Sequence, residues 1–191
     1  MIVAWFGFAL VFLTRKKPPQ APEKTRDRAA GMGIMLQGVA YGLTWSFTAA
    51  RMRHGFRPIV PAEMAAQWAL ALLTVTIAVA SVWLVLAAVR TLGKQWALAA
   101  RLVQDHKLVT AGPYGFLRHP IYTGMLGMLI ATGLAFSIWQ VLLVALALFG
   151  VGTAIRVRSE EKLLRAAFGA EFDEYASRVP AVLPGAVRAG R

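Results

Sequence analysis

The chain has 191 residues, of which 58% are hydrophobic and only 16% are charged. A water-soluble domain carries about 25% charged residues, so this composition indicates a membrane protein. The apolar residues fall in continuous blocks and not in alternation, which predicts spanning α-helices and argues against a β-barrel. The lack of cysteine excludes disulfides, thiolate metal sites and a cysteine nucleophile.

Four apolar blocks follow one another along the chain, at residues 2–14, 31–50, 65–89 and 121–155. The first is short, and no basic residue precedes it as a secretory signal requires, so we interpret it as an N-terminal anchor. As a single helix the last block would be about 52 Å long, well beyond a hydrocarbon core of about 30 Å. We therefore expect it to reverse near residues 133–137 and to form a helical hairpin.

The predicted fold is thus an all-α integral membrane protein with about five transmembrane helices, the last two forming a hairpin, followed by short cytoplasmic C-terminal helices. Residues 1–89 are expected to contribute the N-terminal helices. Residues 90–191 are expected to contribute a cofactor-binding connector, the hairpin and a cytoplasmic tail. The two parts would form one membrane domain.

The basic residues support this helix count, because they fall between the apolar blocks. Of the 21 Lys and Arg residues, six lie in residues 15–28, three in 51–57, five in 90–118 and seven from residue 156 onward. Five spans put the first, third and fourth groups on one side, so the positive-inside rule predicts an outside N-terminus and a cytoplasmic C-terminus. A cytoplasmic face against anionic lipid explains the net charge of +12, and we expect no nucleic-acid partner.

Two polar clusters stand out beside the last apolar block. The first extends from Gln104 to Tyr122 and ends at a helix entrance, where Pro120 suits the first helical turn. These residues alone fit two interpretations equally well, a capped helix start with interfacial tyrosines or a functional site at the membrane edge. The three histidines, at positions 54, 106 and 119, are too far apart for a recognised metal motif, so no metal site is expected.

The second cluster follows the last apolar block. Arg156 and Glu160 stand four residues apart on one helix face and can form an ion pair. An exposed pair would stabilise the protein by less than about 1 kcal/mol and could be an ordinary juxtamembrane salt bridge. The predicted hairpin, however, returns this pair to the level of His119 and Tyr122. We therefore expect the two clusters to face one another at the cytoplasmic edge.

Apolar stripes follow the second cluster on both sides of Gly169, which is the expected helix stop. They are Leu163, Leu164, Ala167 and Phe168 before it, and Phe172, Tyr175 and Val179 after it. Most such stripes are packing surfaces. Here we expect them to lie on the membrane surface or to close over the site as a lid.

The motifs of this region resemble those of the isoprenylcysteine carboxyl methyltransferase family and its relatives among phospholipid methyltransferases. One reads G-x-Y-x-x-x-R-H-P-x-Y-x-G from Gly112 to Gly124. The other reads R-x-x-x-E-E from Arg156, followed by F-G-x-x-[YF]-x-x-Y-x-x-x-V-P from Phe168. The resemblance covers residues 90–184, whereas the N-terminal helices match only in being apolar.

This resemblance implies an S-adenosylmethionine-dependent methyltransferase acting on a lipophilic or prenylated acceptor that enters from the membrane lipid, foremost a carboxylate of the isoprenylcysteine type. It implies a catalytic set of Arg156, Glu160 and Glu161, with Arg156 contacting the acceptor. The residues implied to hold the cofactor are His106, Lys107, Leu108, Val109, Tyr114, Arg118, His119, Pro120, Ile121, Tyr122 and Glu160.

The chemistry of the acceptor separates the alternatives. A carboxylate is nucleophilic at neutral pH and needs no general base, and Arg156 would clamp its two oxygens. An amine acceptor such as phosphatidylethanolamine is protonated at pH 7 and needs a base, for which Glu161 is the candidate. In either case Glu160 would attract the cationic cofactor, and a ring of Tyr114 or Tyr122 would face it. An NADPH-dependent membrane sterol reductase is the third alternative, and the sequence leaves all three open.

Overall fold

The computed structural model describes residues 1–13, 29–52, 64–93 and 108–185, and within these ranges the regular structure is helical, with no strands. This confirms the all-α prediction for the described part of the chain. Two residues expected to bind the cofactor, His106 and Lys107, lie outside these ranges.

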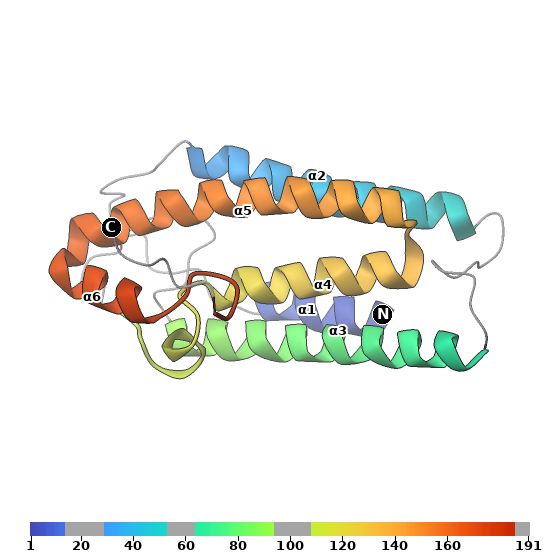
Figure 1. Ribbon diagram of the computed structural model, residues 1–191, viewed down its shortest axis with the longest axis horizontal. Coiled ribbons are helices and arrows are strands. Elements are labelled where there is room, and N and C mark those ends of the chain that lie inside the picture. The colour runs from blue at the N-terminus through green and yellow to red at the C-terminus, as the bar shows by residue number, and fades with distance from the viewer. Residues whose placement is uncertain (14–28, 53–63, 94–107, 186–191) are drawn as a thin grey trace.

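The described residues form six α-helices and one short 3₁₀ helix, joined by turns and loops. They are α1 (Ile2–Leu13), α2 (Ala29–Met52), α3 (Met64–Leu92), η2 (Gly112–Gly115), α4 (Pro120–Phe136), α5 (Trp139–Phe168) and α6 (Ala170–Arg178). Figure 1 shows α1 to α5 along a common axis, with α1, α3 and α5 running in one direction and α2 and α4 in the other. The most extensive packing is between α2 and α5 and between α3 and α4.

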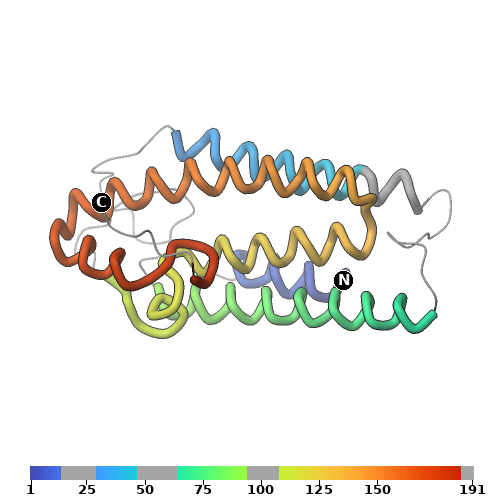
Figure 2. Tube along the Cα trace, viewed as in Figure 1, coloured from blue at the N-terminus to red at the C-terminus, as the bar shows by residue number. Residues whose placement is uncertain are grey.

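The last apolar block folds into the expected hairpin. Helix α4 ends at Phe136 and α5 begins at Trp139, so the chain reverses at Ser137 and Ile138, next to the predicted position. The two antiparallel arms and their tight connection can be followed in Figure 2. Near the reversal, Gly133 lets the arms approach, since a Cβ there would lie 2.4 Å from Cδ1 of Leu142. At the other end α5 stops at Gly169, whose φ of +51° is one that few other residues adopt.

The helices of the bundle differ in length and in apolar character. Among the described residues, α3 and α5 are long and apolar enough to cross a membrane, judged by length and composition. Helices α1 and α4 are apolar but have only 12 and 17 residues. Helix α2 is continuous over 24 residues, but polar side chains such as Gln37 and Thr44 interrupt its apolar sequence. Six α-helices are therefore present among the described residues, while five spans are not confirmed.

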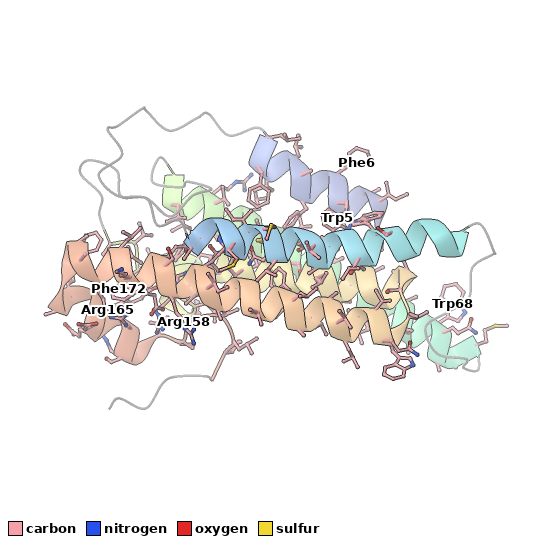
Figure 3. All side chains as sticks on the ribbon, turned by 90° about the horizontal axis from the view of Figure 1, so that it is seen from above. Trp5, Phe6, Trp68, Arg158, Arg165 and Phe172 are labelled. Atoms are coloured by element: carbon pink, nitrogen blue, oxygen red, sulfur yellow. The ribbon has the colours of Figure 1, made fainter. Side chains whose placement is uncertain are left out.

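The outer surface of the bundle carries large apolar side chains. On α3 the exposed ones are Met64, Trp68, Leu72, Leu73, Val75, Val79 and Trp83. A stripe of this length would be unfavourable in water and suits contact with lipid. In Figure 3, Trp68 lies near one end of the bundle, and Arg158, Arg165 and Phe172 lie at the opposite end. Charged side chains thus gather at the end where α5 continues into α6.

Small residues bring α3 and α4 together. A Cβ on Gly124 would lie 2.4 Å from Cγ2 of Val85 and 3.0 Å from the carbonyl oxygen of Ser81. Such close backbone approach is how helices associate where lipid supplies no hydrophobic driving force. The contact fixes the start of α4, where His119 and Pro120 of the first motif are located.

We expect Gly124→Ala to lower the free energy of unfolding by about 1–3 kcal/mol, because the added methyl group must push α3 away. Gly150→Ala is the matched control, since nothing lies within 4 Å of a Cβ there. It should be neutral or stabilise α5 by up to about 1 kcal/mol. Thermal unfolding in detergent measures both, and equal melting temperatures for the two variants would contradict this account of the α3–α4 contact.

Candidate functional site

The hairpin brings the two polar clusters of the sequence together, as predicted. The Tyr122 hydroxyl, on α4, donates a hydrogen bond to Oε1 of Glu160 on α5. The guanidinium carbon of Arg156 lies 5.0 Å from the centroid of the Tyr122 ring. The same ring stacks on His119, with centroids 5.7 Å apart and planes inclined by 20°. Residues some 35 positions apart in the chain therefore line one site.

Two adjacent carboxylates hold the site together through ionic contacts. Glu160 Oε2 lies 3.4 Å from Nδ1 of His119, and Glu160 Oε1 lies 3.5 Å from Nη2 of Arg156. Glu161 Oε1 accepts a hydrogen bond of 2.9 Å from Nε of Arg118, forms an ion pair with Nη2 of Arg118 at 2.9 Å, and lies 3.4 Å from Nε2 of His119. The expected Arg156–Glu160 pair is thus present, but it is a partly buried member of a network and not an exposed surface pair.

His119 is fully enclosed between these carboxylates. Burial by itself lowers the pKa of His119, but the contacts with Glu160 and Glu161 and their negative charges outweigh it, so the pKa is raised above its ordinary value of 6.5. The charged form of the imidazole is therefore favoured relative to that of a free histidine. Its Nε2 makes no hydrogen bond to any described residue.

Arg118 connects the site to the C-terminal segment. Its Nη1 donates to the carbonyl oxygen of Ala176 at 2.7 Å and to that of Val179. Its backbone N–H donates to the carbonyl oxygen of Pro180 at 2.9 Å. The end of α6 is therefore held against the start of α4, and the guanidinium expected to bind cofactor has its donors directed at protein groups.

The second of the predicted apolar stripes forms a small core at this end, and Leu164 and Phe168 of the first stripe pack against it. Phe172, Tyr175 and Val179 are buried there, and Leu108 packs against them. The hydroxyl of Tyr175 donates to the carbonyl oxygen of Tyr114 at 2.6 Å, and burial raises the pKa of Tyr175 to about 12. Helix α6 thus fixes the turn that carries Tyr114.

The remaining residues expected to hold the cofactor take different positions. Val109 is half-buried beside Leu108, Tyr114 is buried, and Pro120 opens the first turn of α4. Ile121 packs on the apolar core that α1, α3 and α4 share. The polar residues that the structure brings together are Arg118, His119, Tyr122, Arg156, Glu160 and Glu161.

Helix α2 contributes a side chain that the sequence did not single out. Gln37 is only 2% exposed, and its Oε1 lies 3.5 Å from Nη1 of Arg156. The sequence offered one signal for it, a single amide side chain within an apolar block. Such side chains commonly form hydrogen bonds between helices inside a membrane.

The site is therefore an ion cluster with both signs of charge, enclosed at one end of an apolar helical bundle. Among the described residues no group of three or more His, Asp or Glu side chains is arranged to hold a metal ion. The cluster instead suits an organic ligand that carries both signs of charge, or a pair of ligands of opposite charge.

Comparison with known proteins gives a consistent assignment. Residues 71–166 match the sequence model of the isoprenylcysteine carboxyl methyltransferase (ICMT) family. The chain belongs to this family.

Individual relatives match over different lengths. The cobalt-zinc-cadmium resistance protein CzcN of Cupriavidus metallidurans is 38% identical over 96 residues, which are 49% of this chain and 44% of that protein. The chain thus matches less than half the length of this relative. A probable protein-S-isoprenylcysteine O-methyltransferase of Oryza sativa subsp. indica is 29% identical over 188 residues, 95% of each chain.

The fold also matches a solved structure. The chain is similar to the eukaryotic intramembrane Ras methyltransferase ICMT, with a TM-score of 0.61 and 20% sequence identity. The match covers 96% of this chain and 63% of that one. At this identity the likeness supports the fold alone, an all-helical arrangement shared with an integral membrane protein.

The raised pKa of His119 predicts how stability depends on pH. A group whose pKa is higher in the folded state stabilises the protein fully below its unfolded pKa of about 6.5 and loses this contribution as the pH rises through the folded value. The charged groups that face it are Glu160, Glu161 and, through them, Arg118 and Arg156. The melting temperature in detergent should therefore fall as the pH is raised from about 6 through the pKa of His119 in the folded protein.

The variant His119→Gln, which cannot titrate, serves as the comparison. Its melting temperature should fall less over the same pH range, because glutamine carries no titrating charge whose stabilising contribution could be lost. A slope identical to that of the parent chain would mean that His119 does not hold an extra proton in the folded state.

Proposed function

We propose that the chain transfers a methyl group from S-adenosylmethionine to the carboxylate of a lipophilic, membrane-dissolved acceptor of the isoprenylcysteine type. Family membership supports the reaction class. The observation that carries the choice of acceptor is the buried guanidinium of Arg156, stacked on Tyr122 and held by Glu160. The proposed topology has the N-terminus outside, the C-terminus in the cytoplasm and the site at the cytoplasmic face.

The chain's own residues fit the cofactor chemically. S-adenosylmethionine supplies a methyl group on a cationic sulfur, and its transfer to a carboxylate forms one oxygen–carbon bond, breaks one sulfur–carbon bond and moves no proton. Glu160 offers negative charge to a sulfonium, whereas the Tyr122 ring already lies under the Arg156 guanidinium and against the His119 imidazole. The buried Nε2 of His119, which lacks a hydrogen bond to the described residues, offers a donor to an amino-acid carboxylate. Leu108, Val109 and Tyr114 would add apolar walls.

Arg156 would serve the acceptor. A guanidinium can donate two parallel hydrogen bonds to a carboxylate, which aligns the attacking oxygen as well as binding it. In-line displacement depends on this alignment more than on acid–base help. Besides electrostatic stabilisation, the main task of the protein would be to hold the cofactor and the acceptor in line for the transfer.

The surroundings of Glu161 favour a carboxylate acceptor over an amine. An amine would need Glu161 as a base, yet Glu161 Oε1 accepts a hydrogen bond from Nε of Arg118 and forms an ion pair with Nη2 of the same residue, and Oε2 lies 3.5 Å from Nη2 of Arg165. A carboxylate bound by two arginines is a poor proton acceptor, because its charged form is stabilised. An acceptor that needs no base fits this arrangement better.

The test is methyl transfer by the detergent-purified chain with methyl-labelled S-adenosylmethionine. Three acceptors are offered separately: an S-prenylated cysteine with a free carboxylate, the same compound with its carboxylate amidated, and phosphatidylethanolamine. We expect label only on the first, in a base-labile ester that mass spectrometry identifies. Label on phosphatidylethanolamine, or uptake of NADPH without binding of S-adenosylmethionine, would overturn the proposal.

For the acceptor site, Arg156→Lys should raise the acceptor KM or lower kcat/KM by about tenfold or more, because an ammonium keeps the charge but loses the two-pronged geometry. The dissociation constant for S-adenosylmethionine should change little. Arg158→Lys is the matched control, being the same substitution on an exposed side chain of the same helix. Equal kinetics for the two variants would remove Arg156 from the site.

A further inference from the structure

Helices α2 and α5 interlock beside the site through a reciprocal arrangement of glycines and polar side chains. A Cβ on Gly33 would lie 2.6 Å from Cγ of Arg156, and a Cβ on Gly152 would lie 3.2 Å from Cγ of Gln37. Each glycine therefore makes room for the stem of the polar side chain on the other helix. The glycine and the polar residue of each helix are four positions apart, so they share one face.

This packing fixes the backbone of both helices at the site. A Cβ on either glycine would come within 2.7 Å of the carbonyl oxygen of the other. Helix α2 consequently cannot slide or rotate at this point without a collision with α5. The distance between the stems of Gln37 and Arg156 is set by backbone contact and not by flexible side chains.

The amide of Gln37 is oriented by a second residue of α5. Its Nε2 donates a hydrogen bond of 2.9 Å to Oγ1 of Thr153, and both side chains are buried. The amide oxygen is thereby directed to Arg156, whose Nη1 lies 3.5 Å away. A buried amide that satisfies both ends in this way has one favoured orientation.

Arg156 is thus held from two helices at two different nitrogens. Nη1 faces Gln37 of α2 and Nη2 faces Glu160 of α5, while the guanidinium carbon lies over the Tyr122 ring of α4. These contacts constrain the plane of the group. The contact from α2 is the neutral one, so it directs the guanidinium without cancelling its charge.

We propose that Gln37 is a positioning residue, which aligns the guanidinium of Arg156 for the acceptor carboxylate without adding a second negative charge beside it. This inference rests on the proposed function. It extends the site to α2, which lies outside the residues 71–166 that the family model matches.

Two variants test this role in different ways. Gln37→Glu preserves the shape but places an ionised carboxylate beside Arg156, where it competes with the acceptor. Gln37→Leu removes the oxygen that directs the guanidinium. Both should raise the KM for the S-prenylated cysteine by about tenfold, with a dissociation constant for S-adenosylmethionine within about twofold of the parent value. Thr153→Val, which releases the amide, should act in the same direction but less strongly.

The matched control is Gln140→Glu, the same change at an exposed position near the start of α5, which should leave the acceptor KM unchanged. If Gln37→Glu and Gln37→Leu keep the parent KM, or if they weaken acceptor and cofactor binding equally, the positioning role is wrong. If the parent chain itself transfers no methyl group to the S-prenylated cysteine, the proposed function fails, and this inference fails with it.

Discussion

Two arginines, two glutamates and a histidine lie buried or half-buried together at one end of an otherwise apolar bundle. A buried ion pair gains little net stability, but removal of one partner leaves an uncompensated charge and typically costs about 3–5 kcal/mol. Arg118, before α4, therefore binds Glu161 on α5, and Arg156 depends on Glu160 and on Gln37 of α2. Helices α2, α4 and α5 cannot separate at this end without exposing a charge to an apolar environment. Rigidity of this kind is what the alignment of two ligands requires.

Much of this arrangement follows from the sequence. The length of the last apolar block exceeds the membrane thickness, so a hairpin is required by geometry alone. Once the chain reverses, His119 and Arg156 must lie at the same end, and the structure confirms their proximity through the ring of Tyr122. The helix stop at Gly169 and the helix start at Pro120 were also predictable, because each depends on the backbone properties of a single residue.

Other features depend on contacts that no local pattern encodes. Arg118 looked like a ligand-binding residue in the motif, yet its Nη1 bonds to carbonyl oxygens at the end of α6, and this requires knowing where α6 packs. Gln37 gave only a weak signal, a lone amide, because its partners lie on α5 more than 110 positions later. The number of spanning helices is also harder to predict than the number of helices, since α1 and α4 are short and their depth depends on neighbouring helices.

The central claim is that α4 and α5 present their polar residues at one common end. Because the chain contains no cysteine, a pair of introduced thiols reports this directly. The double variant Tyr122→Cys/Glu160→Cys should be joined within one chain by a short bifunctional thiol reagent, and mass spectrometry should identify the linked peptides. The double variant Tyr122→Cys/Trp139→Cys should not be joined, since residues 139 and 160 are about 30 Å apart along α5. Linkage of the second pair without the first would contradict the account.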